Sequence, residues 1–275
     1  MKKYNIMLII LFLISLVGVV IYNVYDNNRV VLVKEEISIK DLPESFEGFT
    51  ILQLSDLHEK RFGENQKDLI NMINNLNYDM IAITGDMYSI NSKDDKPFLE
   101  LLDGIKNKEY MFYVSGNHGP KFSDKLEARG CIDLYKPYEI KRDGDSMLVY
   151  DFYDGKKFSD DVKNYDSDVV IGVTHYPWNE SFYLNAESNI GSYDLVLAGH
   201  YHGGQVRIPF YGALFVPNLN EAGFFPNQYD VSGLQDYGSY KQYISRGLGA
   251  SSGSDFTRFR LFNSPEINLI KLVRD

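Results

Sequence analysis

Residues 49–58 read Phe-Thr-Ile-Leu-Gln-Leu-Ser-Asp-Leu-His, and this stretch decides the fold. Its first six residues form a mainly apolar run that predicts a buried strand, and polar residues follow at once. Beyond it, apolar residues recur at helical spacing over 66–76 and 97–106, and strand-like runs occupy 78–84 and 110–115. Strands that alternate with helices of this length predict parallel strands joined by crossover helices.

The pattern is looser after Gly130, where the strand-like runs are short. No linker rich in Pro or Ser divides this part, so residues 31–275 are predicted to form one domain. The predicted fold class is α/β (α+β layered), a four-layer αββα sandwich of two mixed sheets flanked by helices, the first sheet largely parallel. In this part we expect a helix near 181–188 and strands at 147–153, 168–174, 193–198, 205–208, 240–244 and 267–273.

The N-terminal segment is apolar and follows Lys2 and Lys3. Residues 6–22 contain no charge, and these 17 residues are near the shortest length that spans a bilayer as a helix. A cleavable signal peptide is the competing interpretation, but no small-x-small cleavage site follows. We therefore predict an uncleaved transmembrane anchor over residues 1–22 and a short stalk over residues 23–30. The two lysines predict a cytoplasmic N-terminus and an extracytoplasmic domain.

Charge and cysteine content restrict the function further. The net charge is -10 and no long basic stripe is present, which argues against a nucleic-acid partner bound through its phosphates. The chain has one cysteine, Cys131, so neither an internal disulfide nor a Cys-rich metal site can form. Any metal site must therefore use oxygen and nitrogen ligands. The sequence does not indicate an oligomeric state.

Metal-binding residue types follow the predicted strands where each strand ends. These residues are Asp56, His58, Asp86, Asn117, His118, His175, His200 and His202. All five histidines of the chain are in this set. A single histidine at a strand end is more often a hydrogen-bonded surface residue, but the carboxyl ends of strands in open α/β sheets converge on functional sites. Five histidines that all lie at such strand ends therefore predict one shared site.

The spacing within these motifs suits metal binding. Side chains alternate along an extended chain, so the pairs in Asp56-x-His58 and His200-x-His202 each point to one side. Carboxylate, neutral imidazole and amide oxygen ligands favour Mn, Fe or Zn over Ca. A glycine precedes Asp86, Asn117 and His200, which predicts tight turns where the backbone approaches the site.

In this order the motifs resemble those of the calcineurin-like metallophosphoesterase superfamily. The series is Asp-x-His, Gly-Asp, Gly-Asn-His, a lone His and Gly-His-x-His, and it covers residues 49 to about 208. Each of these short motifs occurs by chance in many proteins, whereas all five in this order are specific for the superfamily. Residues 199–210, 245–249 and 262–267 also look like segments of a bacterial membrane-associated, YkuE-like branch of this superfamily.

The resemblance implies a centre with two divalent metal ions, with Mn as the first expectation and Fe or Zn as alternatives. The first ion would be held by Asp56, His58 and His202, and Asp86 would bridge both ions. The second ion would be completed by three residues, Asn117, His175 and His200. His118 would be catalytic without binding metal, since it would assist the leaving group or stabilise the transition state.

The implied activity is hydrolysis of a phosphate ester at the membrane by attack of a metal-bound hydroxide. The substrate would be a phosphorylated small molecule or a lipid-linked phosphate, and the sequence does not separate a monoester from a diester or a pyrophosphate. Arg207, Arg246 and Arg258 are candidate clamps on the phosphate, although a surface ion pair explains each of them as well.

Gly119 departs from the superfamily pattern, because an acidic residue usually follows Gly-Asn-His. The group that normally orients His118 is therefore absent or replaced. Two alternatives follow: a catalytically impaired metal-binding scaffold of the same fold, and a nuclease-type phosphodiesterase, which the negative charge argues against. A protein Ser/Thr phosphatase would show Gly-Asp-x-x-Asp-Arg-Gly, whereas Gly85-Asp86 is followed by Met-Tyr-Ser.

Overall fold

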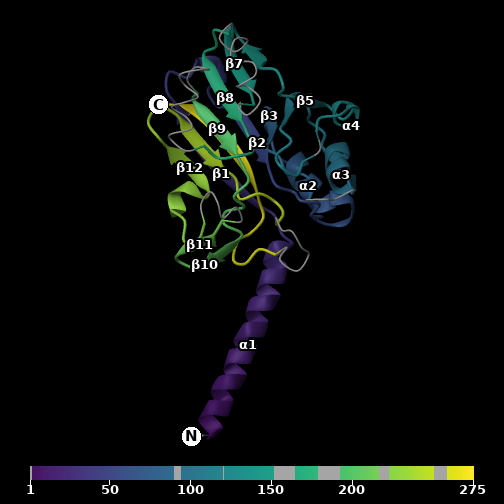
Figure 1. Cartoon of the computed structure of the whole chain (residues 1–275). Helices are drawn as coiled ribbons and strands as arrows, with labels where there is room; N and C mark the ends of the chain where they lie inside the picture. Colours follow the sequence, from purple (N-terminus) through teal and green to yellow (C-terminus); the bar gives the residue numbers. More distant parts are fainter. Residues whose placement is uncertain are drawn as a thin grey trace.

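One long helix projects from the end of a layered α/β domain (Figure 1). The computed structural model describes residues 2–89, 94–119, 121–151, 165–178, 193–216, 223–250 and 259–275. The helix, α1 (Lys2–Asn27), is long and apolar enough to cross a membrane, and its apolar surface packs against nothing in the domain over most of its length. It continues beyond residue 22, so much of the segment predicted as a stalk is helical.

Six strands form the first sheet, in the order β1-β14-β2-β3-β4-β5. The strands are β1 (Val31–Ile39), β2 (Thr50–Leu54), β3 (Met80–Ile83), β4 (Met111–Tyr113), β5 (Cys131–Asp133) and β14 (Glu266–Arg274). Strands β2 to β5 are parallel, as the alternation with helices predicted. The last strand, β14, lies antiparallel to β2 and parallel to β1, so it joins the two ends of the chain in one sheet.

Six further strands form the second sheet, in the order β12-β13-β9-β8-β7-β6. The strands are β6 (Tyr138–Arg142), β7 (Asp145–Tyr150), β8 (Val169–Val173), β9 (Leu195–Ala198), β12 (Gly233–Asp236) and β13 (Lys241–Ile244). The four central strands are parallel, and the two edge strands pair antiparallel with their neighbours. A separate hairpin, β10 (Val206–Ile208) and β11 (Gly212–Phe215), follows β9.

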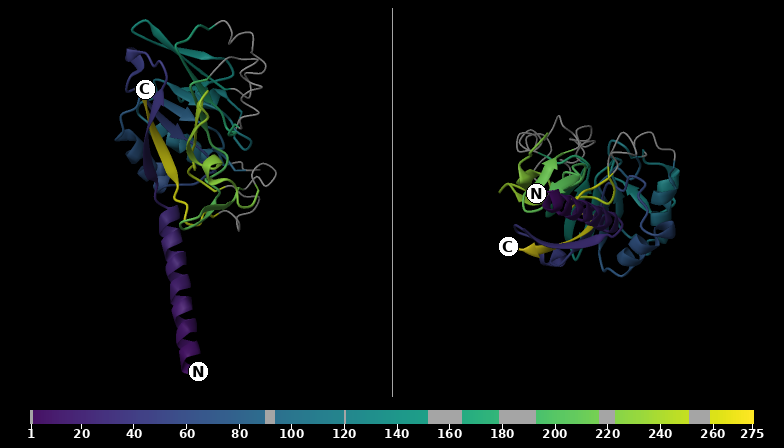
Figure 2. Two further views of the ribbon diagram at one scale, coloured as in Figure 1. Left: turned by 90° about the vertical axis from the view of Figure 1, so that its left-hand side faces the viewer. Right: turned by 90° about the horizontal axis from the view of Figure 1, so that it is seen from below.

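The two sheets pack face to face through one apolar core. Ile51 and Ala82 of the first sheet belong to the same buried cluster as Val149, Ile171 and Leu197 of the second. Helices α2 (Lys67–Asn74), α3 (Lys96–Gly104) and α4 (Asp124–Glu127) cover the other face of the first sheet (Figures 1 and 2). Short 3-10 turns occupy Glu44–Phe46, Glu64–Gln66 and Gln228–Asp230. This packing brings the carboxyl ends of the central strands of both sheets together.

The predicted class, α/β with two large mixed sheets, is confirmed, and the predicted strands and the helices at 66–76 and 97–106 are present within a few residues. Strands β5, β6, β11 and β12 were not predicted, because they are short and only partly buried, so their side chains do not alternate cleanly. The helix predicted near 181–188 lies outside the described residues.

Candidate metal centre

All eight predicted site residues lie in loops at the carboxyl ends of five strands. Each loop directly follows β2, β3, β4, β8 or β9. The first three strands belong to one sheet and the last two to the other, so the site forms where the sheets meet. Neither sheet alone contains enough ligands for two ions.

The first cluster consists of Asp56, His58 and His202, and all three are buried. One ligand atom from each lies within 4.8 Å of the others. The Nε2 atoms of His58 and His202 are 3.2 Å apart. The His202 Nε2 atom is 3.5 Å from Asp56 Oδ1. These atoms converge on a single point, as the ligands of one ion do.

The second cluster consists of Asp86, His175 and His200, with the same spread of ligand atoms. His175 Nε2 lies 3.0 Å from His200 Nδ1 and 3.3 Å from Asp86 Oδ2. The Asn117 side-chain oxygen is 2.8 Å from the same His175 Nε2 atom, so this residue adds an amide oxygen to the cluster.

Asp86 lies between the two clusters. Its Oδ2 atom is 3.6 Å from His58 Nε2 in the first cluster and 3.3 Å from His175 Nε2 in the second. Its other oxygen, Oδ1, accepts a hydrogen bond of 2.7 Å from the His118 backbone N–H, which fixes the carboxylate plane. A carboxylate in this position can contact two ions at once.

The backbone at the ligands differs from the extended conformation that we predicted. Asp56, His58, Asp86, His200 and His202 all have positive φ, from 45° to 71°. The left-handed region is uncommon for residues other than glycine and is concentrated at functional sites. The prediction of an extended chain was wrong, because each strand ends two to four residues before these ligands and the ligands lie on turns. The paired side chains converge all the same.

Glycines allow these turns to approach one another. A Cβ atom on Gly116 would collide with the Asp86 carboxylate, and one on Gly247 would lie 2.7 Å from the Asp56 Cβ atom. Both glycines have positive φ, +73° and +69°. The sequence motif predicted the turn at Gly116, but it gave no indication that residue 247, nearly two hundred positions away, supports Asp56.

Burial sets the protonation of the candidate ligands. It lowers the pKa of His58 to about 4 and that of His200 to about 3, and it lowers the pKa of His202 well below its usual value. Burial raises the pKa of Asp56 to about 6, whereas at Asp86 the hydrogen bond and charge of His175 outweigh burial and lower the pKa to about 2. Near neutral pH these three imidazoles are therefore uncharged, which is the form that binds metal.

The residues fit divalent metal ions. Asp56 Oδ1 is buried and has no hydrogen-bond partner among the described residues. An unsatisfied buried carboxylate oxygen is costly, and neutral imidazole nitrogens 3.2 Å apart have at most one proton to share between them. A cation at each cluster satisfies these atoms together, and the oxygen and nitrogen donors suit Mn, Fe or Zn.

The family model for calcineurin-like phosphoesterases matches residues 49–204, which include every residue of both clusters. The chain belongs to the calcineurin-like phosphoesterase family. Family membership makes it a hydrolase of phosphate esters, and the family requires divalent metal ions.

Named relatives agree with this assignment. The chain is 29% identical to an uncharacterized metallophosphoesterase, Cj0846, of Campylobacter jejuni, over 98% of this chain and 72% of the relative. It is 27% identical to the uncharacterized metallophosphoesterase YkuE of Bacillus subtilis, over 84% and 81% of the two chains. It is 25% identical to phosphodiesterase YaeI of Escherichia coli, over 82% of each chain.

His118 differs from the other histidines of this phosphoesterase, because its ring belongs to neither cluster. Its ring centroid is 5.9 Å from that of His58, so it lies at the edge of the first cluster. A Cβ atom on Gly119 would collide with the Ser115 carbonyl oxygen. The acidic residue usual at this position therefore does not fit the backbone that this chain adopts, and the contact between Asp86 and the His118 N–H provides part of the positioning instead.

The arginines of the site have structural partners. Arg246 forms an ion pair of 2.7 Å with the buried Glu266 carboxylate, and Arg207 donates to the Gly203 carbonyl. Arg258 lies outside the described residues. Sequence analysis missed Arg260, which is buried and donates hydrogen bonds to five backbone carbonyls at positions 246, 247, 249, 263 and 264. No motif indicated it, since its partners are backbone groups.

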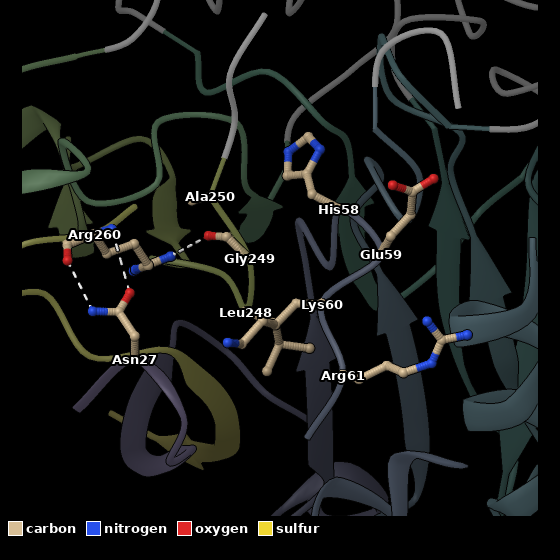
Figure 3. Close-up of a pocket in the computed structure, with 9 residues that line it drawn as sticks. All are labelled: Asn27, His58, Glu59, Lys60, Arg61, Leu248, Gly249, Ala250 and Arg260. Carbon is tan, nitrogen blue, oxygen red and sulfur yellow. Dashed lines mark hydrogen bonds between the residues drawn. The ribbon is translucent and has the colours of Figure 1, made fainter. Parts of the chain in front are cut away.

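A pocket of about 340 Å³ adjoins the first cluster (Figure 3). Its lining runs from His58 to Asn27 at the end of α1, and it includes the basic residues Lys60, Arg61 and Arg260 and the acidic residue Glu59. The pocket therefore places a mainly basic lining next to a candidate metal ligand.

Proposed function

We propose that this phosphoesterase is a dinuclear enzyme that hydrolyses a phosphate ester at a membrane, in which α1 is an uncleaved anchor. The observation that supports the dinuclear centre best is that Asp86, a member of the second cluster, also lies 3.6 Å from His58 in the first. The proposed ligands are Asp56, His58 and His202 for one ion and Asn117, His175 and His200 for the other, with Asp86 shared. Mn is the metal we propose first.

Two divalent ions in these clusters would supply an activated water and neutralise charge on the phosphate. The protein residues have separate tasks. Asp86 is ionised, and the hydrogen bond from the His118 N–H fixes its orientation. Its carboxylate therefore stays in place between the ligands of the two clusters. The side chain of His118 is outside both clusters and can donate a proton or a hydrogen bond to the leaving oxygen. Lys60 can attract an anionic substrate into the adjoining pocket, whereas Arg61 in the same lining is paired with Asp94 and Glu100.

The membrane part of the proposal rests on α1, which exposes apolar side chains along its length. The lysines at its start favour a cytoplasmic N-terminus and an extracytoplasmic catalytic domain. Phosphorylated small molecules and lipid-linked phosphates are both candidate substrates, and a nucleic acid is disfavoured by the net charge of -10.

Hydrolysis and metal content of the full-length protein in detergent test this proposal. With Mn present, we expect turnover of at least one member of a panel of phosphate monoesters, diesters and pyrophosphates, and loss of turnover with a chelator. Asp86→Ala should lose more bound metal than His58→Ala, because it removes a ligand from both ions. Asp143→Ala, in an exposed turn, is the matched control.

Two results would contradict the proposal in different ways. Equal, full metal loading of Asp86→Ala and His58→Ala would remove the bridging role. Full metal loading of the wild type without hydrolysis of any ester above the rate with Mn alone would favour the metal-binding scaffold, which the departure at Gly119 keeps as the alternative.

A further inference from the structure

The last turn of α1 is bound to the domain by hydrogen bonds. Asn27 Nδ2 donates to the Arg260 carbonyl at 2.8 Å, and Ser264 Oγ donates to the buried Asp26 carboxylate at 2.8 Å. The two helical residues are adjacent, and their partners lie in the segment that leads into β14. The helix and the domain therefore keep one orientation at this joint.

The apolar surface of α1 reaches almost to this joint. Val24 and Tyr25 are exposed, and the Tyr22 ring is 6.0 Å from the Phe262 ring, centroid to centroid. One helical turn rises about 5.4 Å, so a bilayer that covers the apolar residues of α1 must end within about one turn of the domain. Apolar side chains at that end of the domain would reach the lipid interface.

The same end of the domain exposes a group of apolar side chains, called here the aromatic tip. Its members are Ile208, Phe210, Tyr211, Phe224 and Phe225. Figures 1 and 2 show the β10–β11 hairpin beside the domain end of α1. Phe210 is fully exposed, and Phe224 and Phe225 are each 65% exposed.

The aromatic tip is part of an ordered hairpin. The Phe225 N–H donates to the Leu214 carbonyl in β11 at 2.8 Å, and its ring is 6.2 Å from that of Tyr211. Large exposed apolar patches usually mark an interaction surface. Aromatic side chains are enriched where a bilayer meets water, and a position beside an apolar helix favours lipid over a protein partner.

The pocket next to the first metal cluster reaches the joint with α1 as well. Its lining joins His58 to Asn27, so it extends from a candidate metal ligand to the joint with α1 (Figure 3). Lys60, also in the lining, donates a hydrogen bond of 2.7 Å to Asn28, the residue after α1. A bilayer around α1 would place its phosphate layer near this pocket.

We propose that the aromatic tip inserts into the interfacial layer of the bilayer that α1 spans, and that the pocket thereby receives a phosphate ester carried by an amphiphile. This inference rests on the proposed anchor and deepens the proposed activity, because it selects a lipid-linked substrate over a water-soluble one.

Depth-dependent quenching tests the insertion. The full-length protein is reconstituted into phosphatidylcholine vesicles with a fluorescent label on Phe210→Cys, and nitroxide lipids are the quenchers. Native Cys131 is buried and burial raises its pKa to about 12, so it should not react. The control label is on Asp143→Cys, in the turn between β6 and β7. We expect at least fivefold stronger quenching at 210 than at 143.

A pair of substrates tests the substrate class. Hexadecyl 4-nitrophenyl phosphate in vesicles and ethyl 4-nitrophenyl phosphate in water share a leaving group. Phe225→Asp suits the positive φ of 52° at that position and places a charge in the tip. It should lower hydrolysis of the hexadecyl ester at least fivefold and leave that of the ethyl ester unchanged, whereas Tyr135→Asp, away from the tip, should change neither.

The outcomes separate this inference from the proposed function. Protein that floats with the vesicles but is quenched equally weakly at both labels overturns the insertion alone. Protein that does not float overturns the anchor and the insertion together. If neither ester is hydrolysed, the substrate class fails, the panel of monoesters, diesters and pyrophosphates decides the proposed activity, and quenching still decides the insertion. Equal loss on both esters in Phe225→Asp overturns the selective role of the tip.

Discussion

His118 is the proposed site residue whose ring lies outside both candidate metal clusters, so its substitution can test catalysis apart from metal binding. Its backbone N–H is fixed by the Asp86 carboxylate, while its ring lies outside both clusters. The acidic neighbour usual in the family is replaced by Gly119, and the close Ser115 carbonyl excludes a larger residue there. The ring is therefore positioned through the backbone and not through a following carboxylate.

His118→Gln should leave metal content and folding nearly unchanged, because it removes no ligand. Turnover of an alkyl phosphate ester should fall about 100-fold, the usual effect of removing one positioned acid or hydrogen-bond donor. The loss should be smaller for a nitrophenyl ester, whose leaving group needs little protonation. Rates for both esters in the wild type and variant check this. Unchanged rates on both would show that His118 has no catalytic role.

At the scale of elements, the loop after β13 is hydrogen-bonded to the backbone at Asp56, a candidate ligand of the first cluster. The Leu248 and Gly249 N–H groups donate to the carbonyls of Ser55 and Asp56. Arg260 in turn binds the carbonyls of this loop, and it is fully buried. Burial lowers its pKa to about 10, so it stays charged at neutral pH. One side chain thus connects the joint with α1 to the backbone of Asp56.

Arg260→Met should destabilise the protein by roughly 3–5 kcal/mol, because it leaves several buried carbonyls without a donor. Metal affinity should fall as well, since the loop behind Asp56 loosens. Chemical denaturation and metal titration of the full-length protein measure both effects. Arg274→Met, at the exposed end of β14, is the matched control and should change neither quantity. A variant with wild-type stability would show that the loop does not depend on Arg260.

At the scale of the whole molecule, α1 and the domain form a single unit with the pocket near their joint. The helix contains 26 residues, which at about 1.5 Å per residue gives roughly 39 Å, enough to cross a bilayer. Its length and composition are those of a helix that can cross a membrane, and the hydrogen bonds at Asp26 and Asn27 orient the domain relative to it.

The full-length protein should sediment with membranes, resist extraction by high salt and retain its N-terminus, because α1 is proposed to remain in the bilayer. Lysines introduced at Leu11 and Ile14 should release it, since each costs about 2.5–3.5 kcal/mol near the bilayer centre. Tyr135→Lys on the domain is the control. A mature soluble form that starts near residues 23–28 would show instead that the segment is a cleaved signal peptide.

The sequence by itself determined the α/β class and the candidate site residues, because both depend on local patterns. Apolar periodicity predicted β2, β3, α2 and α3, and the position of Asp and His directly after strands predicted the site. The turn conformation of Asp56 and His58 was not predictable in this way, since it depends on contacts with distant loops.

Only the tertiary structure showed which distant residues support the site. Gly247 lies in a segment that resembles the YkuE-like branch, but neither its close approach to Asp56 nor the hydrogen bonds of Arg260 to backbone carbonyls follows from a motif. The same holds for the aromatic tip: its phenylalanines resemble core residues in the sequence, and only their exposure beside α1 distinguishes them. Local periodicity specifies elements, whereas burial and proximity arise when the two sheets pack together.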